Sequence, residues 1–290
     1  MGRQKFADRP SALDSVGAVR HNWRTVTTNT FAAEGQALPP ALDAGAPYTS
    51  RLSARSALYS DLQVLLDAQR VTREASFRSL VVDENRLVRK SIAARKKAWQ
   101  ELKTRYILQP EHPLFAAFLS EWNRCRSEPE RGLTAYVLLA LNDRLVADLG
   151  IRWLFPRLRR APAEVRIADI RGFIDGATAL HPEVAAWSDQ TRAAVAQKYA
   201  ASIRDFGLAR GKVNKVTTRP ALYGAPVRLL VRVLRLVGIS PTEMIQARVF
   251  RLLALDGQDV VDALGELNRT NALSFRMQGD VVELEVETRP

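Results

Sequence analysis

The residues best suited to chemistry in this chain are cations that recur at a spacing of seven. Between Arg86 and Arg105 the sequence holds eight cations and one acid, a net charge of +7. A heptad is nearly two turns of an α-helix, so residues seven apart form a row along one side of it. The two rows are Arg89, Lys96 and Lys103, and Lys90 with Lys97. The spacing therefore predicts a helix over residues 88–106 whose basic face binds a polyanion, with a merely solvated face as the alternative.

A second basic segment follows a predicted helix–turn–helix. Apolar spacing predicts helices over 167–177 and 189–206, and Ser188 is placed to cap the second one. Gly207 would end that helix before a short turn rich in cations, and this order of elements predicts a winged-helix module that binds nucleic acid. The candidate readers of the major groove are Gln190, Gln197 and Arg204, and the candidate phosphate contacts in the wing are Arg210, Lys212, Lys215 and Arg219.

Residue types that catalysis uses are present, but without the spacing that it requires. The stretch from Gly207 to Lys212 is one residue short of a phosphate-binding loop, and Val213 replaces the Ser or Thr of that motif. The three histidines lie far apart, and the single Cys125 excludes an intramolecular disulfide and a multi-cysteine zinc site. We therefore expect no enzyme activity, no cofactor, no metal and no small-molecule substrate.

The composition favours a polyanionic partner. The 290 residues carry 43 Lys and Arg against 31 Asp and Glu, a net charge of +12 with a pI near 10.3. Such charge favours DNA, RNA or an anionic membrane surface. However, the longest apolar tract, residues 133–141, is too short to span a bilayer, and the first residues lack the apolar stretch of a signal peptide. We expect a soluble, cytoplasmic protein without a membrane partner.

The periodic segments predict a mainly α fold, a helical bundle with winged-helix or helix-turn-helix modules and small β-hairpin wings. Helices are expected over 114–125, 132–149 and 151–158 in the core, and a hairpin around residues 278–280. From Ala225 to Pro290, eight cations stand against nine acids, which suits protein contact better than DNA contact. The predicted parts are an arm or linker (1–47), a helix-turn-helix-like module (48–112), a helical core with the winged-helix module (113–220) and a C-terminal helical unit with a β-hairpin (221–290).

The order of these motifs resembles that of BrxA, a small helical family of bacterial bacteriophage-exclusion (BREX) defence systems. The likeness covers roughly residues 48–286. Its most specific part is the Trp-Ser-Asp-x-Thr segment at 187–191, followed by Asp-Phe-Gly-Leu at 205–208. The resemblance implies a non-enzymatic, DNA-binding accessory protein that acts beside a methyltransferase, an ATPase and other defence subunits.

We therefore expect binding to double-stranded DNA, mainly through backbone phosphates, with other BREX subunits as further partners. Ala193 and Ala201 leave few readers on the second helix, so sequence preference should be weak. Two alternatives remain open. RNA binding would use the same basic surfaces, and a protein–protein scaffold would use the neutral C-terminal unit.

Overall fold

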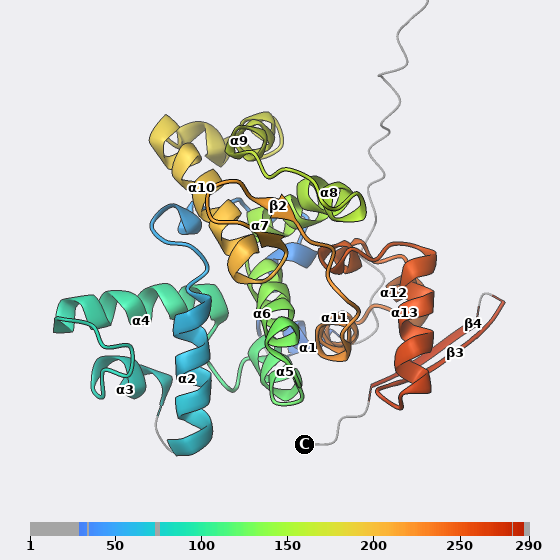
Figure 1. Ribbon diagram of the computed structural model, residues 1–290. Coiled ribbons are helices and arrows are strands. Elements are labelled where there is room, and N and C mark those ends of the chain that lie inside the picture. Colours follow the sequence, from blue (N-terminus) through green and yellow to red (C-terminus); the bar gives the residue numbers. More distant parts are fainter. Residues whose placement is uncertain (1–28, 34, 73–75, 280, 287–290) are drawn as a thin grey trace, which may run out of the picture.

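The computed structural model describes residues 29–33, 35–72, 76–279 and 281–286 as a mainly helical molecule with two small antiparallel hairpins (Figure 1). This confirms the predicted fold class. Residues 1–28 of the predicted arm lie outside the described residues. Later residues of that arm pack on the body. Phe31 in the short helix α1 (Thr30–Ala33) is fully buried, and the turn η1 (Pro40–Leu42) contacts the central helices.

The first lobe consists of α2 (Tyr59–Thr72), α3 (Phe77–Val82) and α4 (Ile92–Tyr106), at the lower left of Figure 1. Helix α4 begins at Ile92 rather than at Val88, because the Ser91 hydroxyl caps it by accepting the Ala94 N–H at 3.2 Å. Val88 itself has a left-handed backbone in the preceding turn. The prediction that Arg89 and Lys90 continue the helical rows is therefore wrong.

Helix α6 (Glu128–Leu141) forms the centre of the molecule. Every residue from Gly132 to Leu141 is buried, so this helix is covered on all sides, as its apolar sequence requires. The predicted helix over 132–149 is wrong, because Asp143 caps a new helix, α7 (Arg144–Asp148), by accepting the Val146 N–H at 3.2 Å. A π-helical turn, η3 (Leu149–Leu154), and α8 (Phe155–Arg159) complete the core with α5 (Pro113–Trp122) and α11 (Gly224–Leu236).

Two further units flank this core. One contains α9 (Ile167–Gly176), η4 (Pro182–Ala186), α10 (Asp189–Asp205), β1 (Ala209–Arg210) and β2 (Val216–Thr217), with the turn η2 (Arg51–Ser53) packed on α10. The other contains α12 (Pro241–Ile245), η5 (Arg248–Leu253), α13 (Gln258–Arg269), β3 (Ser274–Gln278) and β4 (Val281–Glu285). The two short hairpins are the ones that the sequence predicts.

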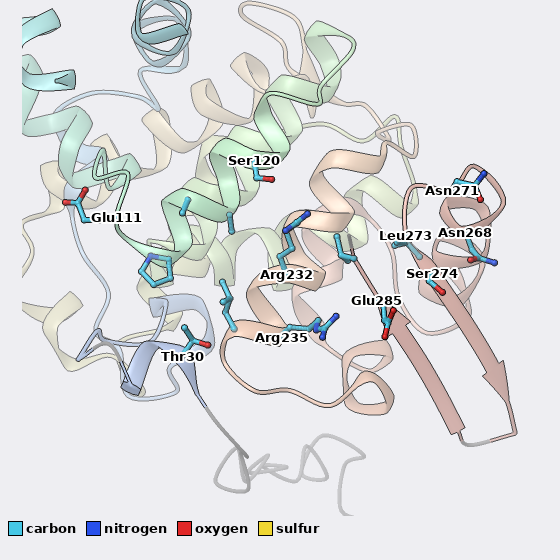
Figure 2. A pocket seen from close by; sticks show the side chains of 15 residues that line it. Thr30, Glu111, Ser120, Arg232, Arg235, Asn268, Asn271, Leu273, Ser274 and Glu285 are labelled. Atoms are coloured by element: carbon cyan, nitrogen blue, oxygen red, sulfur yellow. The ribbon is translucent and has the colours of Figure 1, made fainter. Parts of the chain in front are cut away.

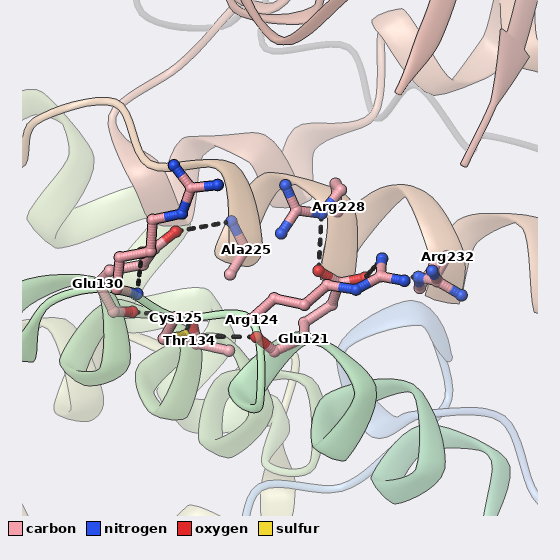
Figure 3. A network of polar contacts seen from close by, with 9 residues as sticks. Glu121, Arg124, Cys125, Glu130, Thr134, Ala225, Arg228 and Arg232 are labelled. Atoms are coloured by element: carbon pink, nitrogen blue, oxygen red, sulfur yellow. Dashed lines mark hydrogen bonds and ion pairs between the residues drawn. The ribbon is translucent and has the colours of Figure 1, made fainter. Parts of the chain in front are cut away.

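A buried ionic cluster joins α5 to α11 (Figure 3). Glu121 on α5 is fully buried, and its two oxygens accept hydrogen bonds from Arg228 Nε at 2.7 Å and Arg232 Nε at 2.6 Å. Arg124 lies 3.6 Å from the same carboxylate. Glu130 of α6 accepts a hydrogen bond from the main-chain N–H of Ala225, in the first turn of α11, at 3.1 Å. Because a buried carboxylate without a cation costs several kcal/mol, these contacts fix how α5, α6 and α11 pair.

Gly150 in the π-helical turn should not tolerate a side chain. A Cβ there would meet the hydroxyl of Tyr136 and lie 2.5 Å from Leu252 Cδ2, and both of those side chains are buried. Overpacking of this kind costs about 1–3 kcal/mol, so Gly150→Ala should lower the free energy of unfolding in urea by that amount. Gly265→Ala in α13, where a Cβ meets nothing within 4 Å, is the matched control and should raise stability by up to about 1 kcal/mol. Equal stability of the two variants would contradict this account.

Cys125 should be a slow nucleophile at neutral pH. Burial raises the pKa of its thiol to about 11, while the Thr134 hydroxyl, 3.5 Å from Sγ, opposes the shift. Because the thiolate is the reactive form, alkylation by iodoacetamide should be slow at pH 7.5 and should accelerate with pH until about 11. In urea the same thiol should titrate near its ordinary value of about 8.5. If the alkylation rate of the folded protein reached a plateau below pH 9, burial would not raise the pKa of this thiol, and the prediction would be contradicted.

Candidate nucleic-acid interface

The predicted wing is a three-stranded arrangement built on the hairpin β1–β2. Ala209 pairs with Thr217 and Arg210 with Val216, and Gly211 begins the turn with a φ of +96°. A third extended segment, residues 163–165, joins the hairpin through the Val165 N–H to Lys215 O bond (2.9 Å) and the Thr217 N–H to Ala163 O bond (2.8 Å). The wing, residues 208–219, is thereby held on the body at its base while its turn projects.

The two helices before the wing are clamped together by ion pairs. Arg171 of α9 lies 2.9 Å from Asp189, and Arg192 of α10 lies 3.4 Å from Asp175. The bond from Arg171, followed by that from Arg192, holds the pKa of the Asp189 carboxyl below its ordinary value. Ser188 caps α10 as predicted, accepting the Thr191 N–H at 3.1 Å. Sequence alone could not pair these charges, because the partners belong to different helices.

Helix α10 buries one side and exposes the other. Val195, Tyr199 and Ile203 are fully buried, whereas Gln190 and Gln197 are exposed, seven residues apart on the opposite side. Arg204 follows on the same side but is only half-exposed, and its Nη2 donates to Asp205 at 2.7 Å. Of the three predicted groove readers, Gln190 and Gln197 therefore have no hydrogen-bond partner among the described residues, whereas Arg204 has one.

The described arginines of the basic segment 86–105 each have a partner within the protein. Arg89 pairs with Asp61 of α2, and Arg86 pairs with Glu84 at 2.9 Å. Arg95 Nη1 donates to the Val82 carbonyl at 3.3 Å. Arg89 is therefore not a free cation, although its spacing in the sequence had suggested that it would be.

Arg105 is the most deeply engaged of them. Its Nη2 donates to the carbonyls of Arg51 and Arg55, both at 3.0 Å, and only 4% of the residue is exposed. Burial lowers the pKa of its guanidinium, an effect that Glu101 opposes. This side chain ties α4 to η2 and cannot serve a ligand.

The lysines of the same segment point outward. Lys90, Lys96 and Lys97 are exposed and Lys103 is half-exposed, and none of them has a carboxylate within 4.0 Å in the described residues. In the wing, Arg210, Lys212 and Arg219 are exposed and Lys215 is half-exposed, its Nζ donating to the Lys212 carbonyl at 3.1 Å. The wing contains no acid between Leu208 and Arg219. Two separate basic surfaces therefore exist, on α4 and on the wing.

Arginine and lysine differ in their contacts throughout the described parts of the chain. Every side-chain ion pair found there uses an arginine or His181 as its cation, and none uses a lysine. The sequence holds eight lysines. Six of the seven that are described lie at or beside the two surfaces, namely Lys90, Lys96, Lys97, Lys103, Lys212 and Lys215, and the seventh, Lys198, lies on α10. The lysines, rather than all cations together, therefore mark the two basic surfaces in the sequence. The net charge does not show this, because it counts lysine and arginine alike.

The part of the chain that the structure describes also bears on metal ligands, on membrane-spanning helices and on the role of His181. There, no three His, Cys, Asp or Glu side chains come together as metal ligands. Across the same residues, no helix has the length and apolar character needed to cross a membrane. His181 is buried, stacks on Tyr48 with ring centroids 3.5 Å apart, and contacts Glu183 at 3.2 Å, so it serves the core.

Comparison with known protein families identifies the family of this chain. No curated protein matches the chain. The family model for BrxA matches residues 46–232, which include the first lobe, the core, both basic surfaces and most of α11. The match covers more than half of the chain and includes the Trp-Ser-Asp-x-Thr segment at 187–191. The chain therefore belongs to the BrxA family, whose members are BREX-associated defence proteins.

Proposed function

We propose that this protein binds duplex DNA as a non-enzymatic accessory component of a BREX defence system, with its lysines on the backbone phosphates. The observation that carries the proposal is the separation of its cations. Arginines supply the ion pairs of the described fold, while lysines gather without carboxylate partners on α4 and on the wing.

The two side chains suit these two tasks for physical reasons. The planar guanidinium of arginine makes several directed hydrogen bonds, which suits buried carboxylates and carbonyls. Lysine is a strongly hydrated point charge on a flexible stem, and neutralising a phosphate with it releases the counterions that DNA has condensed. An exposed lysine that has no acid beside it loses no internal ion pair when it meets a phosphate.

The helix–helix–hairpin unit supports the same proposal through its shape. In a winged helix the second helix enters the major groove and the wing lies along the adjacent backbone. Here α10 would present Gln190 and Gln197, and the wing would present Arg210, Lys212, Lys215 and Arg219. Because two glutamines read few bases, binding should depend little on sequence, with a dissociation constant of roughly 10⁻⁴ to 10⁻⁶ M at physiological salt.

The proposal predicts which variants lose the salt dependence of binding. Each lost phosphate contact lowers the slope of log K against log salt by about 0.9, so Lys96→Glu with Lys97→Glu should lower it by about 1.8. Lys212→Glu with Lys215→Glu should do the same if the wing contacts the same duplex. The measurement is fluorescence anisotropy of labelled duplex DNA across a salt series, with structured RNA as competitor.

The matched control is Arg70→Glu on α2, an exposed cation of the first lobe with no carboxylate within 4.0 Å in the described residues. It should leave the slope unchanged, since it lies off both surfaces. If the slope fell as much in this control as in the lysine variants, the loss would be due to net charge and not to the two basic surfaces. Absence of duplex binding at low salt would overturn the proposal, and tighter binding to RNA than to DNA would replace DNA by RNA as the partner.

A further inference from the structure

Arginines from three elements of the core lie close together. Arg144, Asp148 and Arg152 recur at a spacing of four along α7 and the π-helical turn η3, and residues four apart share a side of a helix. Arg248 and Arg251 lie three apart on η5, and a 3₁₀-helix places residues three apart directly in line. Since η3 packs against η5, the two rows lie side by side. We call the four arginines the arginine surface.

The charges of the arginine surface repel one another. Burial lowers the pKa of the Arg248 guanidinium, and the charges of the other three arginines lower it further, while Asp148 opposes these effects. Like charges held close together destabilise a fold. The stability of the free protein therefore does not explain why these arginines share one surface.

Two of the four guanidiniums have no acid beside them. The other two have carboxylate partners, and these ion pairs are Arg144–Asp148 at 2.9 Å and Arg251–Asp256 at 3.0 Å. Arg152 and Arg248 are exposed, and neither lies within 4.0 Å of a carboxylate among the residues that the structure describes. Both can therefore accept a carboxylate from another molecule without breaking an ion pair of this chain.

A groove of about 1010 Å³ beside the C-terminal hairpin shows the contrast (Figure 2). Its α11 wall carries Arg232 and Arg235, but Glu111 and Glu285 also line it. Charges of both signs around the groove do not select the charge of a ligand. The arginine surface does select one, because its two unpaired side chains are both cations.

The residue types around the arginine surface favour a protein partner over a nucleic acid. The guanidinium of Arg152 lies 5.5 Å from the ring centre of Phe173, and that of Arg251 lies 5.3 Å from the ring centre of Phe155. No lysine occurs on α7, η3 or η5. Arginine and aromatic side chains are enriched in protein–protein interfaces, and lysine is depleted there. The α4 surface is the reverse, since its exposed cations are lysines.

We propose that the arginine surface binds an acidic segment of a partner protein, with carboxylates of that segment on Arg152 and Arg248. The planar guanidinium can hold a carboxylate through two parallel hydrogen bonds. Each carboxylate would also offset the repulsion from the neighbouring arginines. The proposal does not depend on DNA binding, because it uses no residue of the α4 surface or the wing.

The test uses the full chain and a labelled dodecapeptide of alternating Glu and Ala, followed by fluorescence anisotropy at physiological salt. The peptide should bind saturably. Arg152→Glu with Arg248→Glu should weaken binding by about tenfold or more, because two attractions become repulsions. The matched control, Arg70→Glu with Arg276→Glu, makes the same charge change at exposed arginines of α2 and β3. It should change the affinity by less than about twofold, since distant charges are screened.

The lysine surfaces supply the converse control. Lys96→Glu with Lys97→Glu should keep the peptide affinity, and the Arg152 and Arg248 double variant should keep duplex DNA binding. An equal loss of peptide binding in the arginine, lysine and control variants would overturn the proposal, because the peptide would then respond to net charge alone. The absence of saturable peptide binding would also overturn it, without bearing on the DNA proposal.

Stability separates a binding role from a structural one. Arg248→Gln relieves repulsion, so it should leave the urea midpoint of unfolding unchanged or raise it, while it weakens peptide binding. A lower midpoint together with an unchanged peptide affinity would make Arg248 a structural residue and overturn the proposal.

An arginine footprint gives a readout that needs no variant. The full chain is treated with p-hydroxyphenylglyoxal, which modifies accessible guanidiniums, and each arginine is followed by mass spectrometry. The acidic peptide should protect Arg152 and Arg248, and duplex DNA should not. Protection of these two arginines by duplex DNA but not by the peptide would make them a nucleic-acid contact and overturn the proposal.

Discussion

The buried carboxylate of Glu121 is the constraint on which the arrangement of the core depends. It has no exposed surface, so its charge must be met by cations from its neighbours, and Arg228 and Arg232 of α11 meet it directly. This requirement fixes α11 against α5 and, through Glu130, against the fully buried α6. The position of α11 in turn sets one wall of the groove beside the C-terminal hairpin.

The same rule governs the other internal charges. Arg105 ties α4 to η2, Arg171 and Arg192 clamp α9 to α10, and Arg89 holds Asp61. Each of these cations has its partner on another element. Lysine, with its stronger hydration and single point of charge, is left for the surface. A net charge of +12 therefore overstates the number of cations that a ligand can reach, and the placement of seven lysines says more about function than the total does.

Much of this fold could be predicted from periodicity and caps. Ser188, the wing, the C-terminal hairpin and the mainly helical class follow from local signals that act within a few residues. The breaks at Ile92 and Asp143 could have been found from the same signals, since Ser91 and Asp143 are good caps, but apolar spacing continued through them. What could not be predicted was the pairing of Arg89, because its acid, Asp61, lies on another element and 28 residues away in the sequence. Arg204 is different, since its acid is the next residue, Asp205.

The most direct test of the division between arginine and lysine is a lysine footprint. The full chain is treated briefly with acetic anhydride, with and without duplex DNA, and the modification of each lysine is measured by mass spectrometry. The account predicts strong protection of Lys96, Lys97 and Lys212 by DNA, and little change at Lys198, which is half-buried on α10. Equal modification of Lys96, Lys97 and Lys212 with and without DNA, under conditions where the duplex is bound, would contradict it.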